Sequence, residues 1–307
     1  MSIDLRFSNV NPPSPEPSRS IYADILNLPD PVLLGLTVRV FNYDSVGLYM
    51  KVDGYDGAWT IPAVNLGLLG AGSNMYSNLD QMGSRARPAA ALTETITIRL
   101  RAYTDSGYTV LKWTYTRAIS VVFIKSDDGS WTQDFLDNFD DGTVDGWAAV
   151  KSSSYGDMTE AVATDQVLSP AYSLKGTYDL YNISGAQNEF WFYHYKTFAT
   201  PNKATVYALI DVRISSLGDS STYVRVKNLS VLNSTALLIY LGKPYDIVLS
   251  GGDYIPQNRW LRIVVLLPSN SSVQIRVLLD ALRYATAGVG EHSRIYIWLD
   301  DFKIISK

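Results

Sequence analysis

Short segments in which apolar and polar residues alternate are the feature that most constrains the fold of this chain. Residues 95–102 read Thr-Ile-Thr-Ile-Arg-Leu-Arg-Ala, which places the aliphatic side chains on one face of a strand and the polar ones on the other. Residues 36–41 alternate in the same way, and turn-forming sequences such as Thr104-Asp-Ser-Gly separate the segments. Helical periodicity is missing, so the sequence predicts an all-β fold.

The length of 307 residues suits two domains, each with a core of its own. Residues 126–130, Ser-Asp-Asp-Gly-Ser, are polar and contain glycine, and they mark the expected boundary. We expect an N-terminal arm at residues 1–19, a first β-sandwich at 20–128 and a second at 129–307. The strand spacing of the first sandwich resembles that of the immunoglobulin-like accessory domains of surface proteins.

Two segments do not alternate and are expected to lie outside the sheets. Residues 12–17, Pro-Pro-Ser-Pro-Glu-Pro, must be extended, because proline fixes φ and lacks an N–H donor. They form either a spacer or an arm that docks on a neighbouring subunit. Residues 65–91 begin with several glycines and are expected to form a long loop with a helical turn, of the kind that often makes contacts.

Composition excludes several classes of function. A net charge of −4 with scattered Lys and Arg argues against nucleic-acid binding. The absence of cysteine excludes disulfides, thiolate metal sites and cysteine nucleophiles. No apolar stretch is long enough for membrane insertion. No signal-peptide core follows the first residues, which leaves a trimmed leader, another export route such as that of a virion component, or a cytoplasmic location.

Residues 134–147 and 294–307 resemble the first and last elements of jelly-roll carbohydrate-binding modules and their lectin-like relatives. The first reads Asp-Phe-Leu-Asp-Asn-Phe-Asp-Asp-Gly-Thr-Val-Asp-Gly-Trp, and the second carries Asp-Asp in a strand. The resemblance implies a jelly roll whose first and last elements lie together and often hold a structural Ca²⁺. Its ligands here would be Asp140 and Asp300, although the family more often has Glu at the first position. The alternative is that Asp140 only shapes a turn.

Catalysis is not expected. The chain has two histidines, His194 and His292, with no motif around either, and no serine lies in a nucleophile elbow. The Asp-rich segments lie in turns, where solvated loop residues explain them. The protein is therefore predicted not to be an enzyme.

Residues 190–195, Phe-Trp-Phe-Tyr-His-Tyr, are the strongest candidate for a binding surface. In a strand, Trp191, Tyr193 and Tyr195 share one face, and their polar atoms favour contact with water. We expected further polar and aromatic residues on neighbouring strands to join them, namely Arg213, Tyr223 and Arg225. Sugar rings stack on such aromatic side chains, but tyrosine, tryptophan and arginine also dominate protein interfaces.

The sequence thus leaves two functional hypotheses. The first is a non-catalytic binding protein, extracellular or on a cell or virion surface, whose jelly roll recognises glycans. The second is a structural subunit that forms a homo-oligomer in a virion or extracellular filament. In it, the N-terminal arm and the segment 65–91 contact neighbouring subunits.

Overall fold

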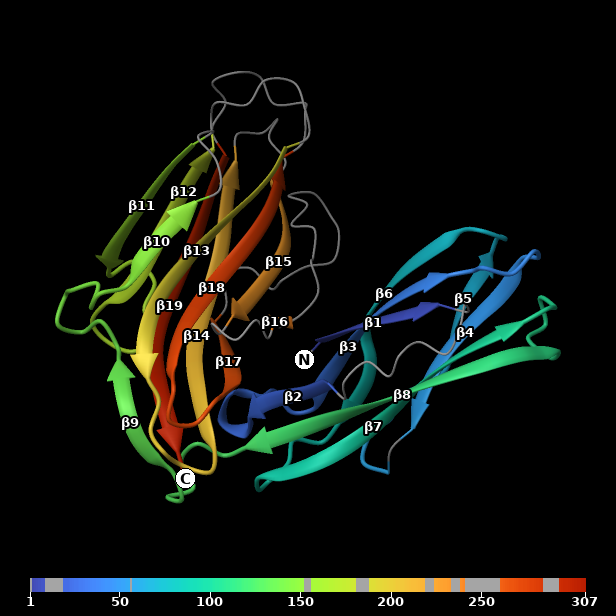
Figure 1. Cartoon of the computed structure of the whole chain (residues 1–307), viewed down its shortest axis with the longest axis horizontal. Helices are drawn as coiled ribbons and strands as arrows, with labels where there is room; N and C mark the ends of the chain where they lie inside the picture. Colours follow the sequence, from blue (N-terminus) through green and yellow to red (C-terminus); the bar gives the residue numbers. More distant parts are fainter. Residues whose placement is uncertain are drawn as a thin grey trace. The chain divides into compact units, whose positions relative to one another are not determined.

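The computed structural model consists almost wholly of β-strands (Figure 1). It describes all residues except 1, 9–18, 56, 152–155, 181–187, 219–223, 233–237, 241–259 and 284–292. The chain divides into two compact units, Met1–Lys125 and Ser126–Lys307. The described residues include one short helical turn, η1 (Ile25–Asn27), and no helix among them is long and apolar enough to cross a membrane. The expected all-β fold is confirmed.

The first unit is a sandwich of two sheets. One has the strand order β2-β8-β7-β4-β5 and the other β1-β3-β6. Alternate residues of β7 face the core, as the pattern of residues 95–102 predicts. The immunoglobulin-like relationship stays a prediction. The strands are β1 (Ser2–Ser8), β2 (Arg19–Asp24), β3 (Val32–Phe41), β4 (Leu48–Tyr55), β5 (Val64–Leu69), β6 (Asn74–Arg85), β7 (Leu92–Tyr103) and β8 (Leu111–Ile124).

One expectation for the first unit was wrong. Most of the segment 65–91, expected to be a loop with a helical turn, forms β5 and β6. The register of β6 on β3 shifts between Leu34 and Leu36, so the core-facing residues of β6 do not keep a spacing of two. Those residues are Met75, Leu79 and Met82.

Residues 3–7 of the N-terminal arm, Ile-Asp-Leu-Arg-Phe, have a strand-like sequence, and the structure has a strand there. Ser2–Ser8 forms β1 and pairs in parallel with β3 of the same chain, so these residues are part of a sheet. The proline-rich residues 12–17 lie outside the described residues.

The second unit is also a sandwich of two sheets. The strand order β10-β13-β18-β15-β16 makes sheet E, and the order β11-β12-β19-β14-β17, with β9 on β19, makes sheet D. The strands are β9 (Thr132–Asp137), β10 (Ala148–Lys151), β11 (Gly156–Ala163), β12 (Ser173–Leu180), β13 (Asn188–Ala199), β14 (Val206–Gly218), β15 (Val224–Leu232), β16 (Leu238–Tyr240), β17 (Trp260–Leu267), β18 (Ser272–Arg283) and β19 (Ser293–Ser306).

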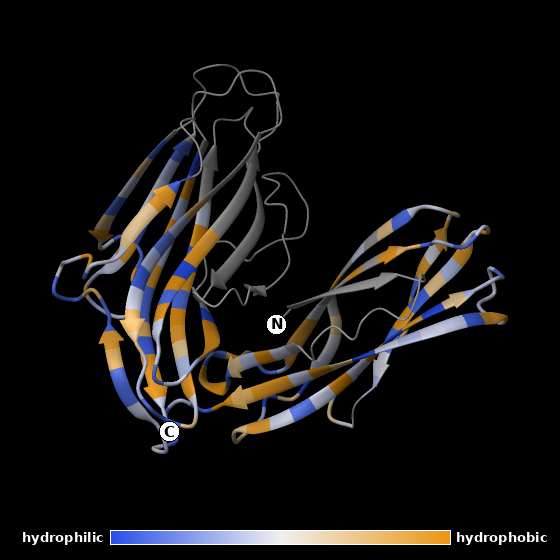
Figure 2. Ribbon diagram, in the orientation of Figure 1, coloured by the Kyte–Doolittle hydropathy of each residue, from blue (hydrophilic) through white to orange (hydrophobic). Residues whose placement is uncertain are grey.

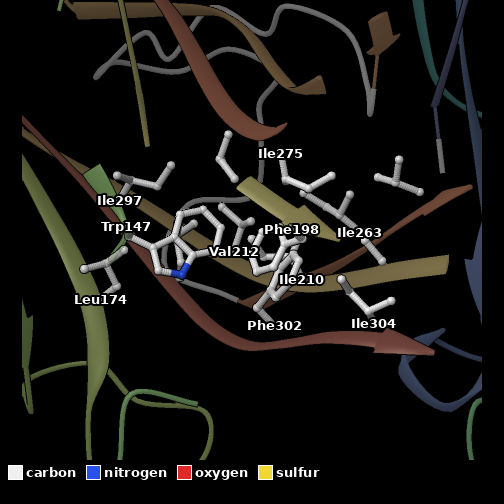
Figure 3. Packing of buried hydrophobic residues seen from close by; sticks show 14 of the residues in the cluster. Trp147, Leu174, Phe198, Ile210, Val212, Ile263, Ile275, Ile297, Phe302 and Ile304 are labelled. Carbon is white, nitrogen blue, oxygen red and sulfur yellow. The ribbon is translucent and has the colours of Figure 1, made fainter. Parts of the chain in front are cut away.

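Each pair of sheets encloses an apolar core. Hydrophobic and hydrophilic residues alternate along the described strands (Figure 2). In the second unit, aliphatic residues of both sheets pack around Trp147, Phe198 and Phe302 (Figure 3). The first strand, β9, pairs with the last, β19, with Asp137 opposite Phe302. The expected jelly-roll arrangement, in which the first and last elements lie together, is therefore present.

Candidate functional site

The opening segment 134–147 contributes to the core and carries a buried carboxyl group. Asp137 ends β9, and its Oδ2 accepts hydrogen bonds from Trp147 Nε1 and Lys196 Nζ, each at 2.9 Å. Burial raises the pKa of Asp137, as does a hydrogen bond shared with Asp145, and with the lowering effects of Lys196 and Trp147 included this pKa is about 6. The same shared hydrogen bond lowers the pKa of Asp145. Below about pH 6 Asp137 is therefore protonated beside an ionised Asp145.

Because of this pair, the stability of the second unit should decrease as pH rises. A folded-state pKa raised above the unfolded value contributes stability that is lost as pH rises through the folded pKa. We therefore expect the free energy of unfolding to fall by about 1–1.5 kcal/mol between pH 5 and pH 7.5 because of Asp137. Asp145, whose pKa is lowered, does not titrate in that window.

Denaturant unfolding at the two pH values measures this loss. Asp137→Asn mimics the protonated carboxyl group and should remove most of the difference. Asp134→Asn, an exposed change in the same strand, should leave it intact. An equal pH dependence in wild type and Asp137→Asn would contradict the assignment.

Asp300, one of the two expected calcium ligands, accepts hydrogen bonds from within the chain. Its Oδ2 accepts from the N–H groups of Leu168 and Ser169, at 2.8 and 3.1 Å. Its Oδ1 accepts from Ser169 Oγ at 2.9 Å and from the N–H of Asp301 at 2.7 Å. Burial raises its pKa, outweighing these donors. Four donors point at the carboxylate where a cation would need its lone pairs, so Asp300 anchors a loop.

Asp140, the other expected ligand, is exposed and holds the same loop. It accepts from Asn138 Nδ2 at 2.5 Å and from the backbone N–H of Ala171. The structure thus brings Asp140 and Asp300 to one loop, residues 168–171, between β11 and β12. Within the described residues, no group of three or more His, Cys, Asp or Glu could hold a metal ion. The structural Ca²⁺ stays a prediction that unfolding with calcium and with chelator would decide.

The outer face of sheet E carries the candidate binding surface. Phe192 and His194 of β13 are buried, whereas Tyr193 and Tyr195 lie on the opposite face and are half-buried. The two tyrosine rings lie 5.7 Å apart and are inclined at 60°.

Strand pairing adds a cation and an amide to this surface. Tyr195 lies opposite Arg276 of β18, and the Arg276 guanidinium lies 5.1 Å from the centre of the Tyr193 ring. Arg276 Nε also donates to Gln274 Oε1 at 2.5 Å. On the other side of β13, Ala148 and Val150 of β10 lie opposite Tyr195 and Tyr193, so the two tyrosines have small neighbours on β10. We call Tyr193, Tyr195, Gln274 and Arg276 the tyrosine face.

The structure gathers only part of the predicted site. Tyr193 and Tyr195 lie together, whereas Arg213, expected beside them, lies in β14 of sheet D, the other sheet. Trp191 and Arg225 lie in β13 and β15, but their side chains fall outside the described part. Tyr223 lies outside the described residues altogether. Gln274 and Arg276 were missed, although their alternation with three buried residues of β18 is visible in the sequence.

The interior of the second unit holds a polar pair that sequence reasoning also missed. His194 of β13 is fully buried, and its Nδ1 lies within hydrogen-bonding distance of Glu160 of β11, in the other sheet. A Cβ added to Gly176 of β12 would lie 2.1 Å from His194 Nε2, so glycine makes room for the ring. No local motif reveals this contact, because Glu160, Gly176 and His194 lie on three successive strands that belong to two different sheets.

No protein-family model matches the chain. No curated protein matches it.

Among solved structures, a structure of carbohydrate-binding modules from the β-sandwich superfamily is 12% identical to this chain. The match covers 90% of this chain and 98% of the other and has a TM-score of 0.34. A module with specific mannan recognition is 10% identical to this chain. The match covers 58% of this chain and 99% of that module and has a TM-score of 0.32. A Caldicellulosiruptor saccharolyticus module in complex with mannohexaose is 16% identical to this chain. The match covers 55% of this chain and 94% of that module and has a TM-score of 0.29.

Proposed function

We propose that the second unit binds glycans on the tyrosine face and that the protein is a non-catalytic binding protein of the extracellular space, a cell surface or a virion surface. The observation that carries this proposal is the arrangement of two half-buried tyrosine rings beside an arginine and a glutamine on one sheet face. Aromatic rings pack against the C–H face of a sugar, and planar polar groups bind its hydroxyls. Trp191 and Arg225 are proposed contributors from the same sheet.

Removing a ring from this face should weaken binding without unfolding the protein. We expect Tyr193→Ala and Tyr195→Ala each to reduce affinity for a retained neutral polysaccharide by about tenfold, which corresponds to 1.4 kcal/mol. Affinity electrophoresis against mannan, β-glucan and galactan measures the loss. The melting temperature should change little, because both rings are only partly buried.

Tyr55→Ala is the matched control, since Tyr55 is 53% exposed on the first unit. It should leave retention unchanged. Retention by both sheet E variants at the wild-type level would exclude the tyrosine face as the binding site.

A structural subunit is the second candidate, and the first unit has a surface that favours it. Leu68, Tyr49, Tyr103 and Leu111 lie opposite one another in a row across β5, β4, β7 and β8. The two leucines are 57% and 52% exposed. Tyr103 within the row is buried, so the exposed apolar surface lies at the two ends of the row, and exposed apolar surface often contacts another protein. Light scattering over a range of concentrations separates the candidates, because a subunit assembles and an isolated binding protein stays monomeric.

A further inference from the structure

The outer face of sheet D carries a row of alternating cations and indoles. Lys175 of β12 lies opposite Trp298 of β19, Trp298 lies opposite Arg213 of β14, and Arg213 lies opposite Trp260 of β17. Residues that are directly opposite share one face of a sheet, so the four side chains form one line across four strands. We call these residues the cation–indole row.

One end of the row is fixed by contacts. Lys175 Nζ lies 4.9 Å from the ring centre of Tyr296 and 5.1 Å from that of Trp298. The Tyr296 and Trp298 rings stack at 5.7 Å. Asp165 accepts from Trp298 Nε1 at 3.1 Å and from Lys175 Nζ at 2.5 Å. The charge of Lys175 is therefore compensated, and Trp298, which is almost fully buried, forms the floor of the row.

Arg213 differs from the other cations on this face. Arg262 pairs with Asp211, and Arg294 pairs with Asp179. Among the described residues no ion pair includes Arg213, and its buried Nε has no hydrogen-bond partner. Arg213 lies opposite an indole on each neighbouring strand, and its planar guanidinium fork matches carboxylate and sulfate groups.

Hydroxyl groups lie next to the row. Tyr296 lies opposite both Thr177 of β12 and Ser215 of β14, two residues along the same strands from the cation–indole row. All three are half-buried, as are Arg213 and Trp260. The face therefore combines an unpaired cation, an accessible indole and a line of hydroxyls, which together suit an acidic sugar.

We propose that the cation–indole row is a second binding site, separate from the tyrosine face, for a polysaccharide that carries carboxylate or sulfate groups. Arg213 binds the anionic group, Trp260 packs on the sugar ring, and the hydroxyls of Thr177, Ser215 and Tyr296 bind its polar substituents. The site does not depend on the tyrosine face, because it lies in the other sheet.

Binding of polygalacturonate and of dextran sulfate by the full chain tests this site. Polygalacturonate supplies carboxylates and dextran sulfate supplies sulfates, so the two polymers identify the preferred anion. We expect wild type to bind at least one of them and Arg213→Gln to lose affinity by about tenfold or more. Arg213→Lys, which keeps the charge without the fork, should retain part of the affinity, and Trp260→Leu should lower it.

Arg294→Gln is the matched control, because it removes a cation from the same face that is already paired with Asp179. It should change affinity less than twofold, and Tyr193→Ala should leave binding of the acidic polymer unchanged. The proposal is overturned if wild type retains neither polymer or if Arg294→Gln costs as much as Arg213→Gln. If Arg213→Gln fails to fold, undiminished binding by both Arg213→Lys and Trp260→Leu overturns it.

Discussion

Replacing Trp147 with alanine is expected to lower the free energy of unfolding of the second unit by about 3–5 kcal/mol. The indole is buried and packs at 5.5 Å against the ring of Phe302 and at 6.0 Å against that of Phe198 (Figure 3). Its Nε1 also donates to Asp137. The substitution therefore leaves a cavity among aromatic rings and removes a donor from a buried carboxyl group, and the two costs add.

Denaturant unfolding of the full chain, followed separately for the two transitions, measures the effect. Trp147→Phe should destabilise the second unit less than Trp147→Ala, because phenylalanine refills most of the cavity. It still loses the hydrogen bond to Asp137. Trp131→Ala is the control, since Trp131 is only half-buried. If Trp131→Ala lowered the free energy of unfolding as much as Trp147→Ala, the opening segment 134–147 would not be what organises the core.

Replacing Gly176 with alanine is expected to destabilise the second unit by about 3 kcal/mol, at the upper end of the usual cost of overpacking. The added Cβ would lie 2.1 Å from His194 Nε2 and 2.5 Å from Cε1. The ring cannot withdraw easily, because it is fully buried and is in contact with Glu160.

A double-mutant cycle identifies the cause of this loss. In a His194→Ala background, Gly176→Ala should cost much less, because the new methyl group enters space that the imidazole has left. The two changes should therefore be non-additive by about 1–3 kcal/mol. Gly57→Ala is the control, since a Cβ there meets nothing within 4 Å. Additive effects would show that the imidazole is not what glycine accommodates.

The parts of the fold that sequence could predict are those encoded by local pattern. Residues 95–102 alternate strictly and form the middle of β7, and the opening and closing segments pair as their resemblance implies. The strand β6 was missed because a register shift on β3 breaks its spacing. A bulge depends on the partner strand, so no local pattern in residues 74–85 reveals it.

The candidate site was predictable only within one strand. Alternation placed Tyr193 and Tyr195 on a common face, because that relation needs no knowledge of pairing. Whether Arg213 joins them depends on the sheet to which β14 belongs, and sequence does not determine this assignment. Arg276 reaches the tyrosine face through the pairing of β13 with β18, which are about eighty residues apart.

The pairing of β9 with β19 has a mechanical consequence for the second unit. The strands are antiparallel, with Thr132 opposite Ser306, so the two ends of the second unit emerge at the same end of one pair of strands. Tension applied between those ends loads the hydrogen bonds of this pair one after another instead of all together. Under pulling, β9 should therefore peel away first, while the remaining strands of both sheets keep their pairing and the two proposed binding faces stay intact.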